Sequence, residues 1–267
     1  MIRSTYEPVS GATAKCCGVD ANFQNVTFVV SLLVQFSTLV LSFVSIFVGD
    51  PPEVLLTIIW LETVVQLIEG AWYTTVGCCF LCGKRSIPIV FRYVDWAVTT
   101  PIMLVTLFVF TMWSADRCMT MADVRAFPSF GGYVALITAM CWLMLLIGLV
   151  YEADWPARTW LASTQRVLRT ALNCPGCGYG IWLGFIPLLA AFAPHTDAYF
   201  RGKSNAGLAA ILVTLVLWTL YGVNAIAAQD PQTKNGVYNV LDVFSKNAAG
   251  VVISIVSLNF NATDAGC

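Results

Sequence analysis

The residues of this sequence best placed for unusual chemistry are Asp242 and Lys246, four positions apart in the apolar run from Val237 to Phe260. Residues at i and i+4 lie on one helix face, so the carboxylate and the amine point into the same space. A lysine at the depth of a lipid bilayer costs about 3 kcal/mol or more, so it needs a partner or a covalent use. An amine removed from water attacks carbonyls and forms Schiff bases. We therefore expect Lys246 to carry an aldehyde chromophore, with Asp242 in its counterion; the alternative is a buried pair that only fixes packing.

A second polar group lies in the run from Glu53 to Cys79. Glu62, Gln66 and Glu69 follow one another at offsets of 4 and 7, which places them on one helix face. Acidic side chains that face lipid are costly, so this face should look toward the bundle interior or toward water. We expect it to line an ion path, and a hydrogen-bonded polar seam between helices is the alternative.

A third group, Arg92, Asp95 and Thr99, shares a face in the run from Ile87 to Trp113. A second buried carboxylate near the amine of Lys246 would keep that amine charged and could accept its proton. The alternative is that Arg92 and Asp95 neutralise each other as a structural pair.

Three aromatic residues could form the walls of a slot for a flat conjugated ligand. Trp218 and Tyr221 are spaced i, i+3 and would form one wall, with Trp96 as another. Aromatic residues at helical spacing are also common in ordinary hydrophobic cores, and that is the alternative for this group.

The composition defines the class of protein that must position these groups. The chain is 58% hydrophobic and only 11% charged, whereas soluble domains are about 25% charged. Several continuous apolar runs reach the roughly 20 residues that cross a bilayer as a helix. The net charge of −1 gives no sign of nucleic-acid binding. We predict an all-α membrane protein with seven spans: Val26–Val48, Glu53–Cys79, Ile87–Trp113, Gly131–Tyr151, Tyr179–Phe192, Ala206–Ala228 and Val237–Phe260.

The predicted domain organisation is a single helical domain, residues 26–260, between an N-terminal segment, 1–25, and a short tail, 261–267. The only histidine, His195, is predicted in a polar loop from Pro194 to Asn205, so no histidine-based triad is expected at membrane depth. The ten cysteines do not have the spacing of a zinc site. We therefore expect neither a metal site nor an enzyme.

The sequence resembles the microbial (type I) rhodopsins in three motifs that occur in the order typical of that family: Arg92-Tyr-x-Asp95-Trp96-x-x-Thr99-Thr100-Pro101, Trp218-x-x-Tyr221 and Asp242-x-x-x-Lys246. The resemblance implies a seven-transmembrane bundle with an internal pocket for all-trans retinal, bound as a Schiff base. It implies Lys246 as the attachment site, Asp95 and Asp242 as counterions, and Arg92 as a cation on the outer side. The pocket residues that it implies are Trp96, Thr99, Thr100, Trp218 and Tyr221, with Cys141, Met144 and Gly148 at the ring end.

Within the microbial rhodopsins, several positions favour a channel over a pump. Proton pumps usually have a carboxylate eleven residues after the position of Asp95, and Thr106 stands there. Lys234 stands where such pumps have a proton-release glutamate. The second span, with Glu62-x6-Glu69, looks like the second helix of channelrhodopsins, as does Asn247 after the lysine. Parts of the chain also look like viral and algal-virus-like rhodopsins, which include both channels and pumps.

The resemblance therefore implies a light-gated ion channel with a central constriction of Ser37, Glu62 and Asn247. Glutamates along the path favour cations, whereas the basic outer segments favour anions, and cation conduction is slightly preferred. The alternatives are an anion-conducting channelrhodopsin and a light-driven outward proton pump with Asp95 as acceptor. The residues predicted to form the ion path are Ser37, Glu62, Gln66, Glu69, Arg92 and Asn247.

The predicted partners are retinal, the lipid bilayer, the permeating ions and further copies of the chain in a dimer or trimer. Family resemblance places the protein in the plasma membrane with its N-terminus outside the cell. The distribution of Lys and Arg between the loops favours the reverse orientation.

Overall fold

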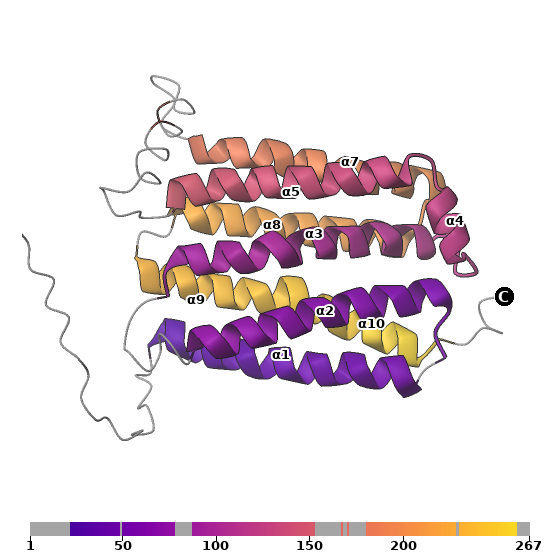
Figure 1. The fold of residues 1–267 in the computed structure, drawn as a ribbon, viewed down its shortest axis with the longest axis horizontal. Helices are drawn as coiled ribbons and strands as arrows, with labels where there is room; N and C mark the ends of the chain where they lie inside the picture. Colours follow the sequence, from indigo (N-terminus) through magenta and orange to yellow (C-terminus); the bar gives the residue numbers. More distant parts are fainter. Residues whose placement is uncertain are drawn as a thin grey trace, which may run out of the picture.

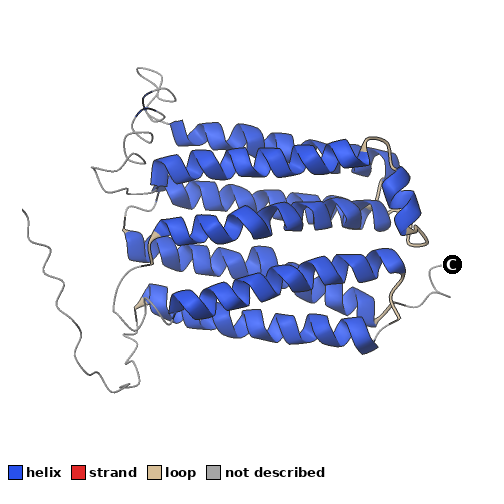
Figure 2. Cartoon of the chain, in the orientation of Figure 1, coloured by secondary structure: helices blue, strands red, loops and turns tan. Residues whose placement is uncertain are grey.

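The computed structural model describes residues 22–48, 50–77, 87–152, 167, 170, 180–227 and 230–260. Throughout this part of the chain the regular structure is helical, without a strand (Figure 2). The predicted tail, 261–267, most of the predicted N-terminal segment, and all cysteines except Cys118 and Cys141 lie outside the described residues.

The helices run alternately in opposite directions along one bundle (Figure 1). One end, where α9 begins, is called the α9 end here, and the opposite end, which carries the short helix α4, is called the α4 end. In chain order the elements are α1 (Phe23–Val48), α2 (Glu53–Val76), α3 (Ile89–Trp113), α4 (Met121–Ala126), α5 (Phe130–Glu152), a 3₁₀ turn (Gly180–Gly184), α7 (Phe185–Gly202), α8 (Asn205–Ala227), α9 (Pro231–Asp242), a π turn (Val243–Asn247) and α10 (Ala248–Leu258).

Six of the described segments are long and apolar enough to cross a membrane: α1, α2, α3, α5, α8 and the continuous segment Pro231–Leu258. The remaining long helix, α7, has 18 residues and packs against α5, α3 and α8, so it completes the bundle. The all-helical membrane fold predicted from the sequence is confirmed.

Two helix starts show how the sequence sets element boundaries. Thr120 caps α4 by accepting a hydrogen bond from the backbone N–H of Asp123, whose carboxylate in turn accepts one from the Thr120 N–H. The Thr120 hydroxyl and backbone both lower the pKa of Asp123. Asp230 caps α9 in the same way, accepting from the Thr233 N–H at 2.7 Å, with Pro231 at the first helical position. The last span therefore begins six residues before the predicted Val237.

The predicted loop from Pro194 to Asn205 is wrong, because α7 continues through Pro194 and ends only at Gly202. His195 is fully buried inside the bundle, with Nε2 2.9 Å from the carbonyl oxygen of Leu104. A proline in a membrane helix is tolerated where the surrounding helices satisfy the freed backbone groups. The imidazole of His195 therefore makes a contact between α7 and α3, whereas Arg201 and Lys203 at the end of α7 are exposed.

The interior of the bundle has an apolar side and a polar side. Helices α3, α5, α7 and α8 enclose a hydrophobic core that includes Leu104, Phe108, Ile137 and Phe192. Most of the buried residues of α1 are polar, and α1 packs against α2, α9 and α10. Lys246 lies between these two sides.

Candidate functional site

Lys246 lies in the π turn that joins α9 to α10, and its side chain is buried. Single π turns inside α-helices occur frequently at functional sites. The amine faces three carboxylates from three helices: Glu69 of α2 in direct contact, Asp95 of α3 at 3.3 Å and Asp242 of α9 at 3.5 Å. Asp242 and Lys246 thus lie on one helix face, as the sequence predicts. Glu69, which the sequence spacing assigned only to an ion path, is a further partner of the lysine.

Asp242 is held more tightly than a lysine partner alone would require. It accepts hydrogen bonds from the hydroxyls of Tyr73 at 2.5 Å and Tyr221 at 2.6 Å. Arg92 donates to it at 3.2 Å. Hydrogen bonds to ionised groups are the strong ones inside proteins, so these three donors stabilise Asp242 as an anion.

Arg92 is fixed mainly by α9. It donates through Nε to the side-chain oxygen of Asn235 at 2.8 Å and through Nη2 to that of Asn239 at 2.5 Å. Among the described residues its ion pair is with Asp242 and not with Asp95. The alternative considered from the sequence, an Arg92–Asp95 pair, is therefore wrong, because Asn235 and Asn239 hold the guanidinium toward α9.

Asp95 keeps one oxygen free for chemistry. Its Oδ2 is 3.3 Å from Lys246, and its buried Oδ1 has no hydrogen-bond partner in the described part of the chain. Thr99, predicted as a pocket residue, is buried one turn away, where its hydroxyl donates to the backbone carbonyl of Asp95. Thr99 thus supports α3 and does not line the cavity described next.

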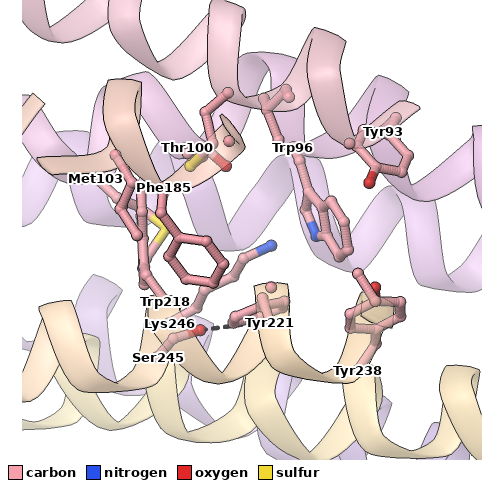
Figure 3. Close-up of a pocket in the computed structure, with 17 residues that line it drawn as sticks. Tyr93, Trp96, Thr100, Met103, Phe185, Trp218, Tyr221, Tyr238, Ser245 and Lys246 are labelled. Carbon is pink, nitrogen blue, oxygen red and sulfur yellow. Dashed lines mark hydrogen bonds between the residues drawn. The ribbon is translucent and has the colours of Figure 1, made fainter. Parts of the chain in front are cut away.

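A cavity of about 750 Å³, counting its open mouth, lies beside Lys246. Its walls are mainly aromatic and apolar, and the amine points from one wall toward Trp96 (Figure 3). Trp96 contacts the rings of Tyr221 and Tyr238 edge-on, with centroids 5.4 and 5.1 Å apart. Ligand pockets are mostly apolar with a few placed polar groups, so the lining fits a flat apolar ligand joined to the lysine.

Most of the predicted pocket residues do line this cavity, and two do not. Cys141 is buried in the hydrophobic core beside the cavity, and Thr99 faces the backbone of α3. The predicted residues in the cavity wall are Trp96, Thr100, Met144, Gly148, Trp218, Tyr221 and Lys246.

Sequence reasoning missed several wall residues, some of which could have been found. Met103 follows Trp96 by seven positions and Thr100 by three, so helical periodicity places it on the same face of α3. Tyr238 lies one turn before Asp242 on the same face of α9. Phe185 and Leu188 of α7 and Ser245 of the π turn carry no comparable signal.

The predicted constriction is only partly assembled. Ser37 is exposed on the outer face of α1, and its hydroxyl donates to the carbonyl of Leu33 in its own helix. Its assignment to the ion path is therefore wrong: the face of α1 that points inward carries Gln35 and Thr38. Glu62 and Asn247 are buried as predicted.

Of the other predicted path residues, Arg92 lies with Asp242 and α9, while the remaining four form a buried polar group. Asn247 donates to Gln35 Oε1 at 3.0 Å, and Gln35 Nε2 donates to Glu69 at 2.8 Å. Gln66 makes two longer bonds of 3.4 Å, one to Glu62 and one to the backbone carbonyl of Lys246. The structure thus brings Glu62, Gln66, Glu69 and Asn247 into one buried polar group next to the lysine.

The family model described as "Bacteriorhodopsin-like protein" matches residues 22–259, which is nearly the whole chain. The chain belongs to this family. This rhodopsin also resembles solved structures in fold. The crystal structure of viral rhodopsin OLPVRII is 23% identical, with a TM-score of 0.64, covering 87% of this chain and 96% of that one. No curated protein sequence is significantly similar to the chain.

Two ion pumps have the same fold. Halorhodopsin from Halobacterium salinarum, in its bromide-bound form, is 18% identical, with a TM-score of 0.62, covering 89% of this chain and 94% of that one. Xanthorhodopsin, a light-driven ion pump with a dual chromophore, is 18% identical, also with a TM-score of 0.62, covering 91% of this chain and 94% of that one. Proteins of this family bind retinal. The family and the long apolar helices together make this rhodopsin an integral membrane protein.

Proposed function

We propose that this rhodopsin binds all-trans retinal covalently at Lys246 and acts as a light-gated ion channel that favours cations. The attachment is supported by a buried amine at the wall of an aromatic cavity, beside three carboxylates. The bound retinal would supply light absorption and isomerisation. The protein would supply the remaining functions: a slot that orients the polyene, charges that hold the proton at Lys246 Nζ, and a path for ions.

The observation that carries the channel proposal is the inner face of α1. Its buried residues from the middle of the helix to the α4 end are all polar: Ser31, Gln35, Thr38, Ser42 and Ser45. The exposed side of the same helix is rich in large hydrophobic residues, as expected for contact with lipid. Polar residues in a membrane helix face the bundle interior or a water-filled cavity and mark substrate or ion pathways.

Helices α2 and α10 complete this polar seam with Glu62, Gln66, Ser254 and Ser257. Ser42 and Ser254 contact each other across the interface of α1 and α10 at 3.3 Å. Among the described residues, one oxygen each of Gln66, Asn247 and Ser257 is buried without a hydrogen-bond partner. Buried polar atoms without protein partners are the sites that ordered water satisfies, so the seam is suited to hydration.

Thr38 takes the place that the sequence had suggested for Ser37. Gly250 of α10 lies against Thr38 of α1 and against Gln66 and Glu62 of α2, so the three helices pack closely there. We infer that Thr38, Glu62 and Asn247 form the constriction. When the charge at Lys246 changes, its backbone contact with Gln66 and the Asn247–Gln35 bond would transmit the change to this point.

An outward proton pump is the competing function, favoured by the unpartnered Oδ1 of Asp95, which could accept a proton from Lys246. The α4 half of α3 offers no carboxylate to return it, because residues 101–113 include no Asp or Glu and the buried Thr106 stands where a pump would carry one. We also propose, from family resemblance, that the protein lies in the plasma membrane with its N-terminus outside the cell. The same resemblance suggests assembly into a dimer or trimer.

The test is a light-triggered current–voltage curve from cells that express the full chain with added retinal. A channel gives a current that reverses near the equilibrium potential of the permeating ion, whereas a pump current does not reverse. Replacing external sodium should shift the reversal potential, and a shift with chloride alone would overturn the preference for cations. Lys246→Ala should abolish both the visible absorption band and the current.

A matched pair of variants tests the path itself. Glu62→Gln removes a buried carboxylate from the seam and should change ion selectivity or closing kinetics. Ser37→Ala alters a residue on the outer face of the neighbouring helix and should leave both unchanged. Equal effects of the two variants would remove the seam of α1, α2 and α10 from the ion path.

A further inference from the structure

The three carboxylates around Lys246 do not have equal roles, because they accept different numbers of hydrogen bonds from residues other than the lysine. Asp242 is already saturated by Tyr73, Tyr221 and Arg92. Its oxygen is the most distant of the three from the amine, at 3.5 Å. Asp242 is thus chiefly the partner of Arg92, and two carboxylates remain for the lysine.

Glu69 is better placed than Asp95 for the remaining role. Its Oε1 makes the closest contact with Lys246 Nζ, whereas Asp95 lies at 3.3 Å. Glu69 is 0% exposed, so its charge is not screened by solvent. Its second oxygen accepts a hydrogen bond from Gln35 Nε2 at 2.8 Å, while the second oxygen of Asp95 has no partner among the described residues. The Gln35 amide favours the ionised form of Glu69, because a hydrogen bond to a carboxylate stabilises its negative charge.

Gln35 links this ion pair to the helix that carries the lysine. Its Nε2 donates to Glu69, and its Oε1 accepts from Asn247 Nδ2 at 3.0 Å. An ionised carboxylate can only accept hydrogen bonds, so Glu69 fixes which way round the Gln35 amide lies. That orientation in turn presents the oxygen of Gln35 to Asn247, directly after Lys246 in the π turn.

We propose that Glu69 is the principal ion-pair partner of Lys246 Nζ, and that Gln35 couples its charge to Asn247. The inference rests on retinal attachment at Lys246 but not on channel activity. If the N–H bond at Lys246 breaks and an O–H bond forms at Glu69 Oε1, the positive and negative charges disappear together. The Gln35–Glu69 bond then becomes a neutral one, with roughly half its former strength. Asn247 then loses its fixed acceptor, which loosens the contact between α1 and the π turn.

The first test is the visible absorption maximum of the full chain purified with retinal. A negative charge near the nitrogen stabilises the ground state more than the excited state, so its removal shifts absorption to longer wavelength. Glu69→Gln should give a larger shift than Asp242→Asn and one at least as large as Asp95→Asn. Asp197→Asn is the control: it removes a carboxylate that pairs with Arg201 and not with the lysine, and it should leave the absorption maximum in place. An unchanged maximum in Glu69→Gln would overturn the proposal.

Two further variants test the role of Glu69 even if Glu69→Gln does not fold. Glu69→Asp keeps the charge but withdraws it by one methylene, so the maximum should still move, and no movement would count against the ion pair. Gln35→Met removes both hydrogen bonds at nearly constant volume. One hydrogen bond changes an equilibrium or rate constant by a factor of about two to ten. Gln35→Met should therefore alter the decay rate of the light-induced state by a factor in that range.

The coupling itself is tested by combining the variants. In Glu69→Gln the hydrogen bond between the Gln35 amide and residue 69 is already a neutral one. Adding Gln35→Met to this variant should therefore change the decay rate by a smaller factor than Gln35→Met alone changes it in the parent protein. Fully additive effects would overturn the coupling while leaving the ion pair in place. A shifted spectrum without photocurrent would refute the channel proposal and support this one. A photocurrent together with an unchanged absorption maximum in Glu69→Gln would support the channel proposal and refute the ion pair between Glu69 and Lys246.

Discussion

The hydroxyl of Tyr73 offers a quantitative test of how the site stabilises its charges. It donates to Asp242 at 2.5 Å and lies 3.5 Å from Arg92, inside the bundle. Hydrogen bonds to charged groups contribute about 1.5–3 kcal/mol. Tyr73→Phe removes this bond, but Asp242 keeps Tyr221 and Arg92, so we expect the lower half of that range, about 1.5–2 kcal/mol. The aromatic ring is retained, and its stacking on Phe28, with centroids 4.9 Å apart, should persist.

The assay is equilibrium unfolding of the purified protein in mixed micelles containing a denaturing detergent. A loss of about 1.5 kcal/mol lowers the folding equilibrium constant roughly tenfold. Tyr133→Phe is the matched control, because Tyr133 also donates to a carboxylate, that of Asp197 at 3.1 Å, but in a partly buried position at the end of the bundle. That change should cost clearly less than Tyr73→Phe, because water replaces the lost partner there. Equal losses in the two variants would refute the idea that the buried charge cluster makes the Tyr73 bond exceptional.

Two other predictions address the pocket wall and the α4 cap. Gly148→Ala should destabilise the protein by about 1–3 kcal/mol, because the new methyl would meet the Tyr93 ring, which Glu152 holds by a 2.5 Å bond. Gly132→Ala, with open space around it, should be neutral or stabilising in the same unfolding assay, and the reverse order would contradict the packing. Thr120→Ala should raise the pKa of Asp123 toward its ordinary value in a carboxyl NMR titration. Because folding lowers that pKa, the cap stabilises the fold above the pKa of the unfolded state and is lost as pH falls, so parent and variant should converge in acid.

The spans and the lysine site could be predicted because each depends on local spacing. Asp242 and Lys246 share a face through the i, i+4 rule, and the apolar runs have bilayer length. What the sequence could not give were choices between partners in different helices. Arg92 is three residues from Asp95, yet Asn235 and Asn239, far along the chain, draw it to Asp242. Glu69 has helical spacing to Glu62, but only the packing of α2 against the π turn brings it to Lys246.

The errors have similar causes. Proline and polar residues usually end a helix, which predicts a loop at His195, but α7 continues through Pro194 and the imidazole meets the Leu104 carbonyl of α3. The assignment of Ser37 to the ion path came from family resemblance, and its spacing from the other polar residues of α1 does not place it on the inner face. The polar periodicity of Ser31, Gln35, Thr38 and Ser42, spaced by four, three and four, was visible in the sequence and identifies that face correctly.

The five-residue turn at Val243–Asn247 also fixes the rotational phase of everything after it. Each residue of an α-helix advances about 100° around the axis. If the same residues formed an ordinary α-helix here, with none deleted, α10 would turn by about that angle relative to α9. Ser254 and Ser257, now fully enclosed, would swing toward the hydrocarbon, while Asp242 stayed with Arg92. One wide turn thus sets both where the amine points and which face of the following helix packs against α1 and α2.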